Sequence, residues 1–230
     1  MIGLDAAELD FIRRHLHALP RLRRVLELGA LHRLASTAGA LTGSVWPTFA
    51  TGTLPGEHGI YHHLQWDAEA MRIRRVTAEW LDFEAFWCDL ERRGLRVAAV
   101  DVPMTFPSGL ERGLEIINWG SHDELGAFST APRALAREVH RRFGPHPMGP
   151  EIPVRKTPGQ LERIRRNLVA GARVKSELLR WVLGRADWDF FLGVFGETHR
   201  GGHLLWPASE DAASHQPLLD VYRAVDAGVG

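Results

Sequence analysis

The sequence has a single cysteine, Cys88, so it cannot form a disulfide within the chain. No apolar run approaches the roughly 20 residues needed to cross a bilayer, and the start lacks the basic and then apolar pattern of a secretion signal. The 28 basic residues, which include only two lysines, balance the 28 acidic ones, so no net charge attracts the chain to nucleic acid or to an anionic membrane. We therefore expect a cytoplasmic protein, provided that the true N-terminus is present, with neither nucleic-acid polymers nor membranes as partners.

The chain does contain alternating helical and strand-like patterns, which are typical of an α/β domain. They predict one domain over residues 1–230, built as three α/β/α layers around a mostly parallel sheet, with an excursion from that sheet at about 105–160. Thr130 is expected to cap one of the helices. The predicted helices cover 9–16, 20–29, 79–94, 130–144 and 159–185, and the predicted strands cover 31–37, 95–100 and 188–195.

The segment from Leu41 to Ile60, LTGSVWPTFATGTLPGEHGI, carries the most information about chemistry. Thr42 precedes a helical run, whose free N–H groups at Gly43 and Ser44 and positive dipole end would favour a phosphate. Taken alone, the pattern fits a nucleophilic threonine and a simple helix N-cap equally well. Ser44 is a weaker candidate for the nucleophile, because it would lie one turn further into the helix.

A second, downstream pattern favours the nucleophile. The signature TG-x-x-P-x-x-HGI ends this segment, and Thr42 lies sixteen residues before its histidine, His58. This arrangement resembles the nucleophile segment of the type I phosphodiesterase and nucleotide pyrophosphatase family, in the alkaline phosphatase superfamily. Pro47 departs from the family pattern, since a proline five residues after Thr42 would remove an interior helix hydrogen bond unless the helix begins later.

Two further segments are similar to metal-binding segments of that family. IGLDAAELD resembles its opening turn, which places Asp5 as a metal ligand after the first strand. GVFGETHRGGHLLWP resembles the stretch that supplies ligands for a second metal, with His203 at the histidine and His199 where aspartate is most common. Four residues separate the two histidines, so a helical turn would place both imidazoles on one face. Glu197 could bind the metal instead or orient an imidazole.

Glu197 is also a candidate for the substrate pocket, and four other residues are candidates for that pocket only. Gly43 would line it beside the nucleophile, and Asn118, His122 and Asp101 follow a strand that the family ends in a similar turn. For Asp101 a purely structural turn is the favoured interpretation.

The resemblance implies two divalent metal ions, one held by Asp5 and Thr42 and the other by His199 and His203, each completed by family ligands that lie beyond residue 230. Imidazole ligands favour zinc, while manganese remains possible. The implied reaction is hydrolysis of a phosphodiester or pyrophosphate bond in a small phosphorylated substrate, through a phosphothreonine at Thr42. Two alternatives stay open: a phosphomonoester or phosphonate hydrolase of the same superfamily, and an inactive family member, apparently truncated at both ends, with a residual binding role.

Overall fold

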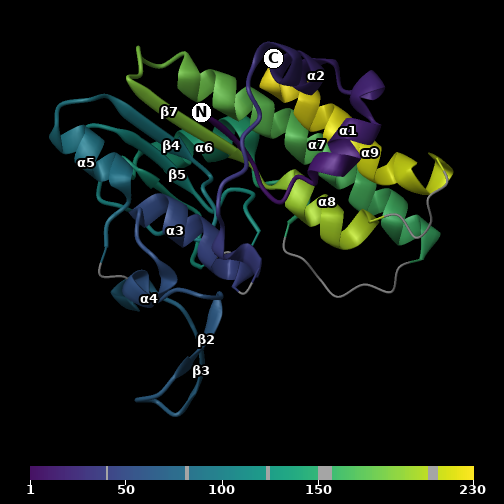
Figure 1. Ribbon diagram of the computed structural model, residues 1–230. Coiled ribbons are helices and arrows are strands. Elements are labelled where there is room, and N and C mark those ends of the chain that lie inside the picture. The colour runs from purple at the N-terminus through teal and green to yellow at the C-terminus, as the bar shows by residue number, and fades with distance from the viewer. Residues whose placement is uncertain (40, 81–82, 123–124, 150–156, 207–211) are drawn as a thin grey trace. The chain divides into compact units, whose positions relative to one another are not determined.

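The computed structural model describes residues 1–39, 41–80, 83–122, 125–149, 157–206 and 212–230 (Figure 1). The chain divides into two compact units, each assembled from segments that are distant in sequence. Unit 1 contains Met1, Arg33–Glu138 and Ala186–Gly193, and unit 2 contains Ile2–His32, Val139–Arg185 and Val194–Gly230.

The main sheet has five strands in the order β1-β7-β4-β5-β6. The central strand β4 pairs in parallel with β5 and β7, and β6 pairs antiparallel with β5 at one edge. All four residues of β4 are buried, as expected for a strand covered on both faces. A mostly parallel sheet flanked by helices confirms the predicted α/β class. The strands are β1 (Ile2–Leu4), β4 (Val97–Val100), β5 (Leu114–Ile117), β6 (Ser129–Ala131) and β7 (Phe190–Phe195).

In unit 1, short helices and a hairpin follow one another after the turn that carries Thr42. Two of the helices end at glycines in the left-handed region, Gly52 at φ 69° and Gly59 at φ 73°, which only glycine adopts without strain. The elements are η2 (Thr37–Gly39), η3 (Thr42–Ser44), α3 (Val45–Thr51), α4 (Pro55–His58), β2 (Leu64–Asp67), β3 (Arg72–Arg75), η4 (Ala78–Trp80) and α5 (Phe86–Arg92).

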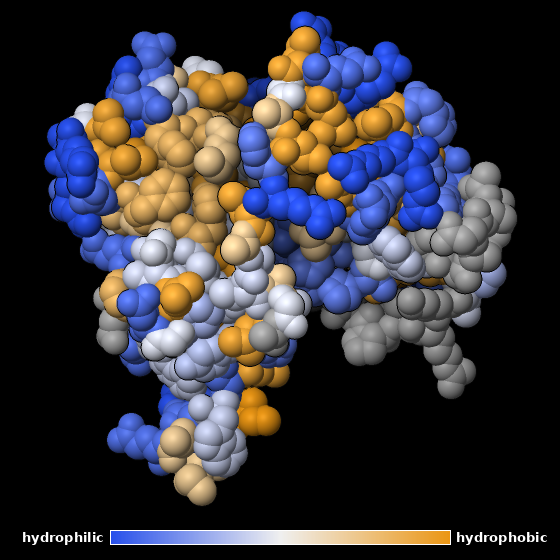
Figure 2. Space-filling model, viewed as in Figure 1, coloured by the Kyte–Doolittle hydropathy of each residue, from blue (hydrophilic) through white to orange (hydrophobic). Residues whose placement is uncertain are grey.

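The β2–β3 hairpin exposes apolar side chains next to charged ones. Trp66 is paired across the two strands with Ile73, and both are more than half exposed. Figure 2 accordingly shows apolar and hydrophilic surface side by side on this hairpin.

In unit 2, helices pack around a core that contains Phe11, Leu19, Leu168, Leu218 and Tyr222, each at most 2% exposed. The long helix α7 begins with a capping box at Thr157 and Gln160, with proline at its first position. The helices are α1 (Leu9–Arg14), η1 (Leu16–Ala18), α2 (Pro20–Leu28), α7 (Pro158–Leu183), α8 (Glu197–Leu205) and α9 (Ala212–Val229), while α6 (Leu135–Phe143) runs from unit 1 into unit 2. In the described part of the chain, no helix has the length and apolarity to cross a membrane.

Three local predictions are wrong. Residues 31–36 form no strand, because Leu31 and Leu34 are exposed and have no sheet to pack on. Thr130 lies in β6 and does not cap a helix. Helix α5 begins at Phe86, later than predicted; residues 81–82 lie outside the described residues.

The stretch 105–160, expected to leave the main sheet, in fact supplies β5 and β6. Short strands of three and four residues carry too little periodicity to be read from sequence. Residues 150–156, also in this stretch, are not among those described.

Candidate active site

Thr42 opens the turn η3 in unit 1 and is exposed. Helix α3 begins three residues later, at Val45, so Pro47 falls in its first turn, where an N–H has no intrahelical acceptor to lose. The departure from the family pattern at Pro47 therefore leaves the helix intact. An exposed hydroxyl just before a helix is accessible to a substrate.

Ser44 has a structural role instead. Its side chain is fully buried, and its hydroxyl oxygen lies 2.7 Å from Thr37 Oγ1 and 2.5 Å from the Leu41 carbonyl oxygen. The Ser44 N–H donates to the Leu41 carbonyl oxygen at 3.0 Å. The prediction that this N–H is free to bind a phosphate is therefore wrong. Ser44 holds the turn together, which leaves Thr42 as the accessible hydroxyl.

Gly43 lies against the backbone of the segment that follows the HGI signature. A Cβ atom at position 43 would stand 2.5 Å from the Tyr61 carbonyl oxygen and 2.9 Å from His62 Cα. Only glycine fits this close approach. The backbone after the signature is thereby fixed beside the residue that follows Thr42.

The signature histidine, His58, connects the same segment to α3. Its Nδ1 accepts a hydrogen bond from the Ile60 N–H at 3.1 Å, so its Nε2 carries the proton and lies 3.0 Å from Thr48 Oγ1. The ring is 1% exposed, and burial lowers the pKa of His58. His58 is thus a neutral structural residue that holds the signature against α3.

Asp5 lies in unit 2, directly after β1, and is 5% exposed. Its backbone is held from both sides: the Asp5 N–H donates to the Phe195 carbonyl oxygen at 3.0 Å, and the Thr198 hydroxyl donates to the Asp5 carbonyl oxygen at 2.6 Å. The carboxylate Oδ2 lies 2.7 Å from His199 Nδ1. The ends of β1 and β7 therefore position this carboxylate against the first turn of α8.

His199 and His203 lie on successive turns of α8, as their spacing predicted. Their rings are stacked, with centroids 4.8 Å apart, and their Nε2 atoms are 2.9 Å apart. In a tetrahedral zinc site with Zn–N bonds of about 2.0–2.1 Å, two nitrogens are about 3.3 Å apart. When the Nδ1–H of His199 donates its hydrogen bond to the Asp5 carboxylate, Nε2 of that neutral ring is available as a ligand. This donor set fits a divalent metal after a shift of a few tenths of an ångström.

The structure thus brings together Asp5, His199 and His203 within unit 2. Thr42 belongs to unit 1, so its convergence with these three residues stays a prediction.

The model of the type I phosphodiesterase / nucleotide pyrophosphatase family matches residues 1–230, the whole chain. The chain belongs to this family. No curated protein is significantly similar to it.

Two solved structures show that the chain has the fold of the alkaline phosphatase superfamily. Both are of phosphonoacetate hydrolase from Sinorhizobium meliloti 1021. The complex with phosphonoformate is 17% identical with a TM-score of 0.56, and the complex with phosphonoacetate is 18% identical with a TM-score of 0.57. Each alignment covers 100% of this chain and 52% of the other. The family member described here therefore spans about half the length of these relatives.

Asp101 and Asn118 were expected as pocket candidates of this phosphodiesterase family member. Their side chains form hydrogen bonds within unit 1. The Asp101 carboxylate accepts hydrogen bonds from the Trp119 and Gly120 N–H groups at 2.8 and 2.9 Å. The Asn118 amide donates to the Gly126 carbonyl oxygen at 3.0 Å. Both residues have positive φ, 58° and 54°, a conformation that costs energy for a non-glycine residue. These contacts support the structural interpretation of Asp101.

Glu197, expected as a metal ligand or an orienting group, points into the interior of unit 2. Its carboxylate is fully buried, and Oε1 lies 3.0 Å from Nε2 of His146. Burial alone would raise the pKa of Glu197, but the nearby charge of Lys175 and the His146 hydrogen bond outweigh it and hold that pKa below its usual value. Glu197 therefore anchors the first turn of α8, two residues before His199.

His146 was missed by the sequence interpretation. The Met148 N–H donates to its Nδ1 at 3.2 Å, which leaves the proton on Nε2 for Glu197. Room for the ring comes from Gly171 in α7, where a Cβ atom would stand 2.4 Å from His146 Nε2. The available signal was a glycine inside an otherwise regular helix, which often has a packing reason.

Proposed function

We propose that this family member hydrolyses a phosphodiester or pyrophosphate bond of a small phosphorylated substrate, with Thr42 as the nucleophile. The observation that carries the proposal is the exposed Thr42 hydroxyl on a turn whose neighbours are fixed. Ser44 holds the turn from inside, and Gly43 holds it against the segment after the signature. Pre-organisation of this kind places an attacking atom without further ordering on substrate binding.

In the proposed reaction Thr42 Oγ forms a bond to phosphorus while the bond from phosphorus to the leaving-group oxygen breaks. The leaving group departs with the electron pair of that bond, and the proton of the Thr42 hydroxyl is released to solvent. Water then attacks the phosphorus of the phosphothreonine, the phosphorus–Oγ bond breaks, and the threonine oxygen takes up a proton from that water to return the hydroxyl. A threonine hydroxyl is a weak nucleophile near neutral pH, so the reaction needs an activating group.

Asp5, His199 and His203 are the residues of unit 2 proposed to hold divalent metal, with Thr42 as a further ligand. When bound, the metal would lower the pKa of the nucleophile and stabilise charge on the phosphoryl oxygens. Two imidazoles and a carboxylate favour zinc, with manganese as the alternative. The Asp5 contact to His199 Nδ1 supports an orienting role for this carboxylate, in addition to the ligand role that the family resemblance implies.

Hydrolysis of a phosphonate is the second candidate. It is favoured by the two solved relatives, which were determined with phosphonoacetate and phosphonoformate bound. At 17% and 18% identity the likeness extends to the fold alone, so the ester and pyrophosphate reaction remains the first proposal.

Thr42→Ala tests the proposal when assayed with zinc or manganese on bis(p-nitrophenyl) phosphate, p-nitrophenyl phosphate and phosphonoacetate. We expect turnover to disappear in Thr42→Ala and to persist in part in Thr42→Ser. A phosphoryl adduct on the peptide that carries Thr42, which keeps the second ester group when the substrate is a diester, would identify the intermediate by mass spectrometry after acid quench. Undiminished turnover in Thr42→Ala would eliminate the nucleophile assignment. The substrate with the highest kcat/KM decides between ester and phosphonate hydrolysis.

A further inference from the structure

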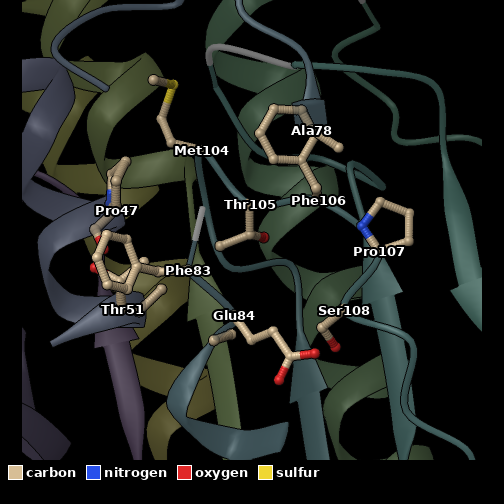
Figure 3. Close-up of a pocket in the computed structure, with 12 residues that line it drawn as sticks. Pro47, Thr51, Ala78, Phe83, Glu84, Met104, Thr105, Phe106, Pro107 and Ser108 are labelled. Atoms are coloured by element: carbon tan, nitrogen blue, oxygen red, sulfur yellow. The ribbon is translucent and has the colours of Figure 1, made fainter. Parts of the chain in front are cut away.

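A pocket of about 220 Å³ opens in unit 1 beside α3 (Figure 3). Its walls come from four places: α3 itself, Ala78 at the start of η4, the residues just before α5, and the loop that follows β4. Figure 3 shows Phe83 and Phe106 on different walls of the pocket. The lining residues are Pro47, Ala50, Thr51, Ala78, Phe83, Glu84, Ala85, Met104, Thr105, Phe106, Pro107 and Ser108.

The polar groups of this lining already have partners within unit 1. The hydroxyl of Thr51 donates to the Pro47 carbonyl oxygen at 2.7 Å, and that of Thr105 donates to the Val102 carbonyl oxygen at 2.7 Å. The Ser108 hydroxyl donates to the Glu115 carboxylate at 2.9 Å.

Among the described lining residues, Glu84 contributes the one charged group, and its carboxylate forms an ion pair with Arg92. No basic residue is among the described lining residues, so the pocket has nothing to hold a phosphate. Its chemistry suits an uncharged apolar group, since such a group is favoured wherever it leaves water for an apolar surface.

The size of the pocket limits what it can take. An apolar cavity of about 150 Å³ lined by aliphatic and aromatic side chains holds a benzene molecule. Pockets for whole drug-sized ligands begin at about 300 Å³. At about 220 Å³ this pocket fits one substituted aromatic ring or a short alkyl chain, which is one part of a larger molecule.

Helix α3 connects this pocket to the proposed nucleophile. Thr42 opens the turn before α3, and Pro47 and Thr51 of the pocket wall lie five and nine residues further along. At a rise of about 1.5 Å per residue, these walls lie roughly 8 to 14 Å along the helix from Thr42. A substituent attached to a phosphoryl group through a few bonds spans that distance.

We propose that this pocket binds an uncharged aryl or short alkyl group of the phosphorylated substrate and so sets its specificity. That the ligand is a phosphorylated substrate rests on the proposed function. That an apolar group binds rests on the pocket alone. It predicts a preference for esters with a ring or a short chain a few bonds from phosphorus over methyl esters.

Ala78→Phe is the variant that tests the pocket, because Ala78 is an exposed lining residue where a ring can fill the space without disturbing the core. Ala70→Phe is the matched control, since Ala70 is also exposed, follows β2 and lies outside the described lining. Phe83→Ala, at a side chain 37% exposed, removes one wall and serves as a second, independent variant.

Binding of the uncharged fluorophore N-phenyl-1-naphthylamine gives a readout that needs no activity. We expect saturable binding that weakens about ten-fold or more in Ala78→Phe and Phe83→Ala, is unchanged in Ala70→Phe and Thr42→Ala, and is not displaced by inorganic phosphate. Equal affinity of the fluorophore for Ala78→Phe and the unmodified chain, or its displacement by phosphate, would show that it does not bind in this pocket.

The kinetic arm compares kcat/KM for a phenylpropyl and a methyl phosphodiester. Loss of the preference for the phenylpropyl ester in Ala78→Phe, with methyl ester turnover kept, supports the assignment to substrate. If Ala78→Phe keeps the preference for the phenylpropyl ester, the assignment of the pocket to the substrate is wrong. If turnover is then lost in Thr42→Ala and kept in the pocket variants, the proposed hydrolase function is still supported.

Discussion

His146 and Glu197 form a buried pair, in which the imidazole Nε2 lies 3.0 Å from carboxylate Oε1 although 51 positions separate the two residues. The side chains are 3% and 0% exposed. Lys175, also fully buried, donates to the Val194 carbonyl oxygen at 3.3 Å and adds positive charge to the same interior. Glu197 begins the helix that carries His199 and His203, so the pair fixes the start of that helix from within unit 2.

We predict that His146→Ala destabilises the protein by about 3 kcal/mol. The variant leaves the Glu197 carboxylate buried without its hydrogen-bond donor, and breaking a buried polar pair on one side costs about that much. Urea denaturation followed by circular dichroism measures the loss. The double variant His146→Ala/Glu197→Gln removes the charge as well and should recover part of the stability; a double variant as unstable as the sum of both single ones would contradict the pairing.

Gly171→Ala tests the space that the imidazole of His146 occupies. A methyl group would stand 2.4 Å from the ring Nε2, closer than any real contact, so the ring or the helix must move. We expect a loss of about 1–3 kcal/mol in unfolding free energy. Gly159→Ala is the control in the same helix, because nothing lies within 4 Å of its added atom, and it should be neutral or slightly stabilising. Equal effects of the two changes would contradict the packing.

Short-range patterns made much of this site predictable. The signature around His58 and the four-residue spacing of His199 and His203 are local, so they identify residues without any knowledge of the fold. The fold class followed similarly from alternating patterns. The role of His146 has no local signal, because its partner Glu197 is brought to it by the packing of α7 and α8.

Other errors have the same origin. Thr130 precedes a helical pattern and fits a cap, yet it pairs with Ile116 of β5 once the sheet forms. Partners that lie far along the chain thus override local preference. The apolar pocket beside α3 could not be predicted either, since its walls come from segments that are separate in sequence.

The buried His58 predicts a pH dependence of stability. Burial lowers its pKa, so the unfolded chain takes up a proton at His58 from about pH 6.5 downward before the folded chain does. The contribution of His58 is therefore complete above about pH 6.5 and is lost as the pH falls toward the folded pKa, by at most about 1.4 kcal/mol per pH unit. His58→Gln removes this titration.

Denaturation of both proteins at pH 7.5 and pH 5.5 checks this prediction. The stability difference between the unmodified protein and His58→Gln should be smaller at the lower pH. The comparison cancels the other histidines, which titrate in both proteins. A difference that stays constant or grows on acidification would show that His58 is not kept neutral by burial.

The last prediction concerns metal binding by the 230-residue chain itself. His199 and His203 offer two imidazole nitrogens 2.9 Å apart, and Asp5 holds one of the rings by its Nδ1. A zinc site needs at least three protein ligands, so we expect weak binding of zinc. Binding should be lost in His203→Ala, because only one imidazole of the pair is left.

Asp5→Asn should weaken binding about 10- to 100-fold, the usual effect of losing the carboxylate that orients a histidine ligand. His140→Ala, at an exposed histidine of α6, is the control and should bind as the unmodified chain does. Isothermal titration with zinc at pH 7.5 measures all four proteins, and affinity should fall at pH 5.5 because the imidazoles must be neutral to bind. Tight binding of two zinc ions that survives His203→Ala would show that other residues form the metal site.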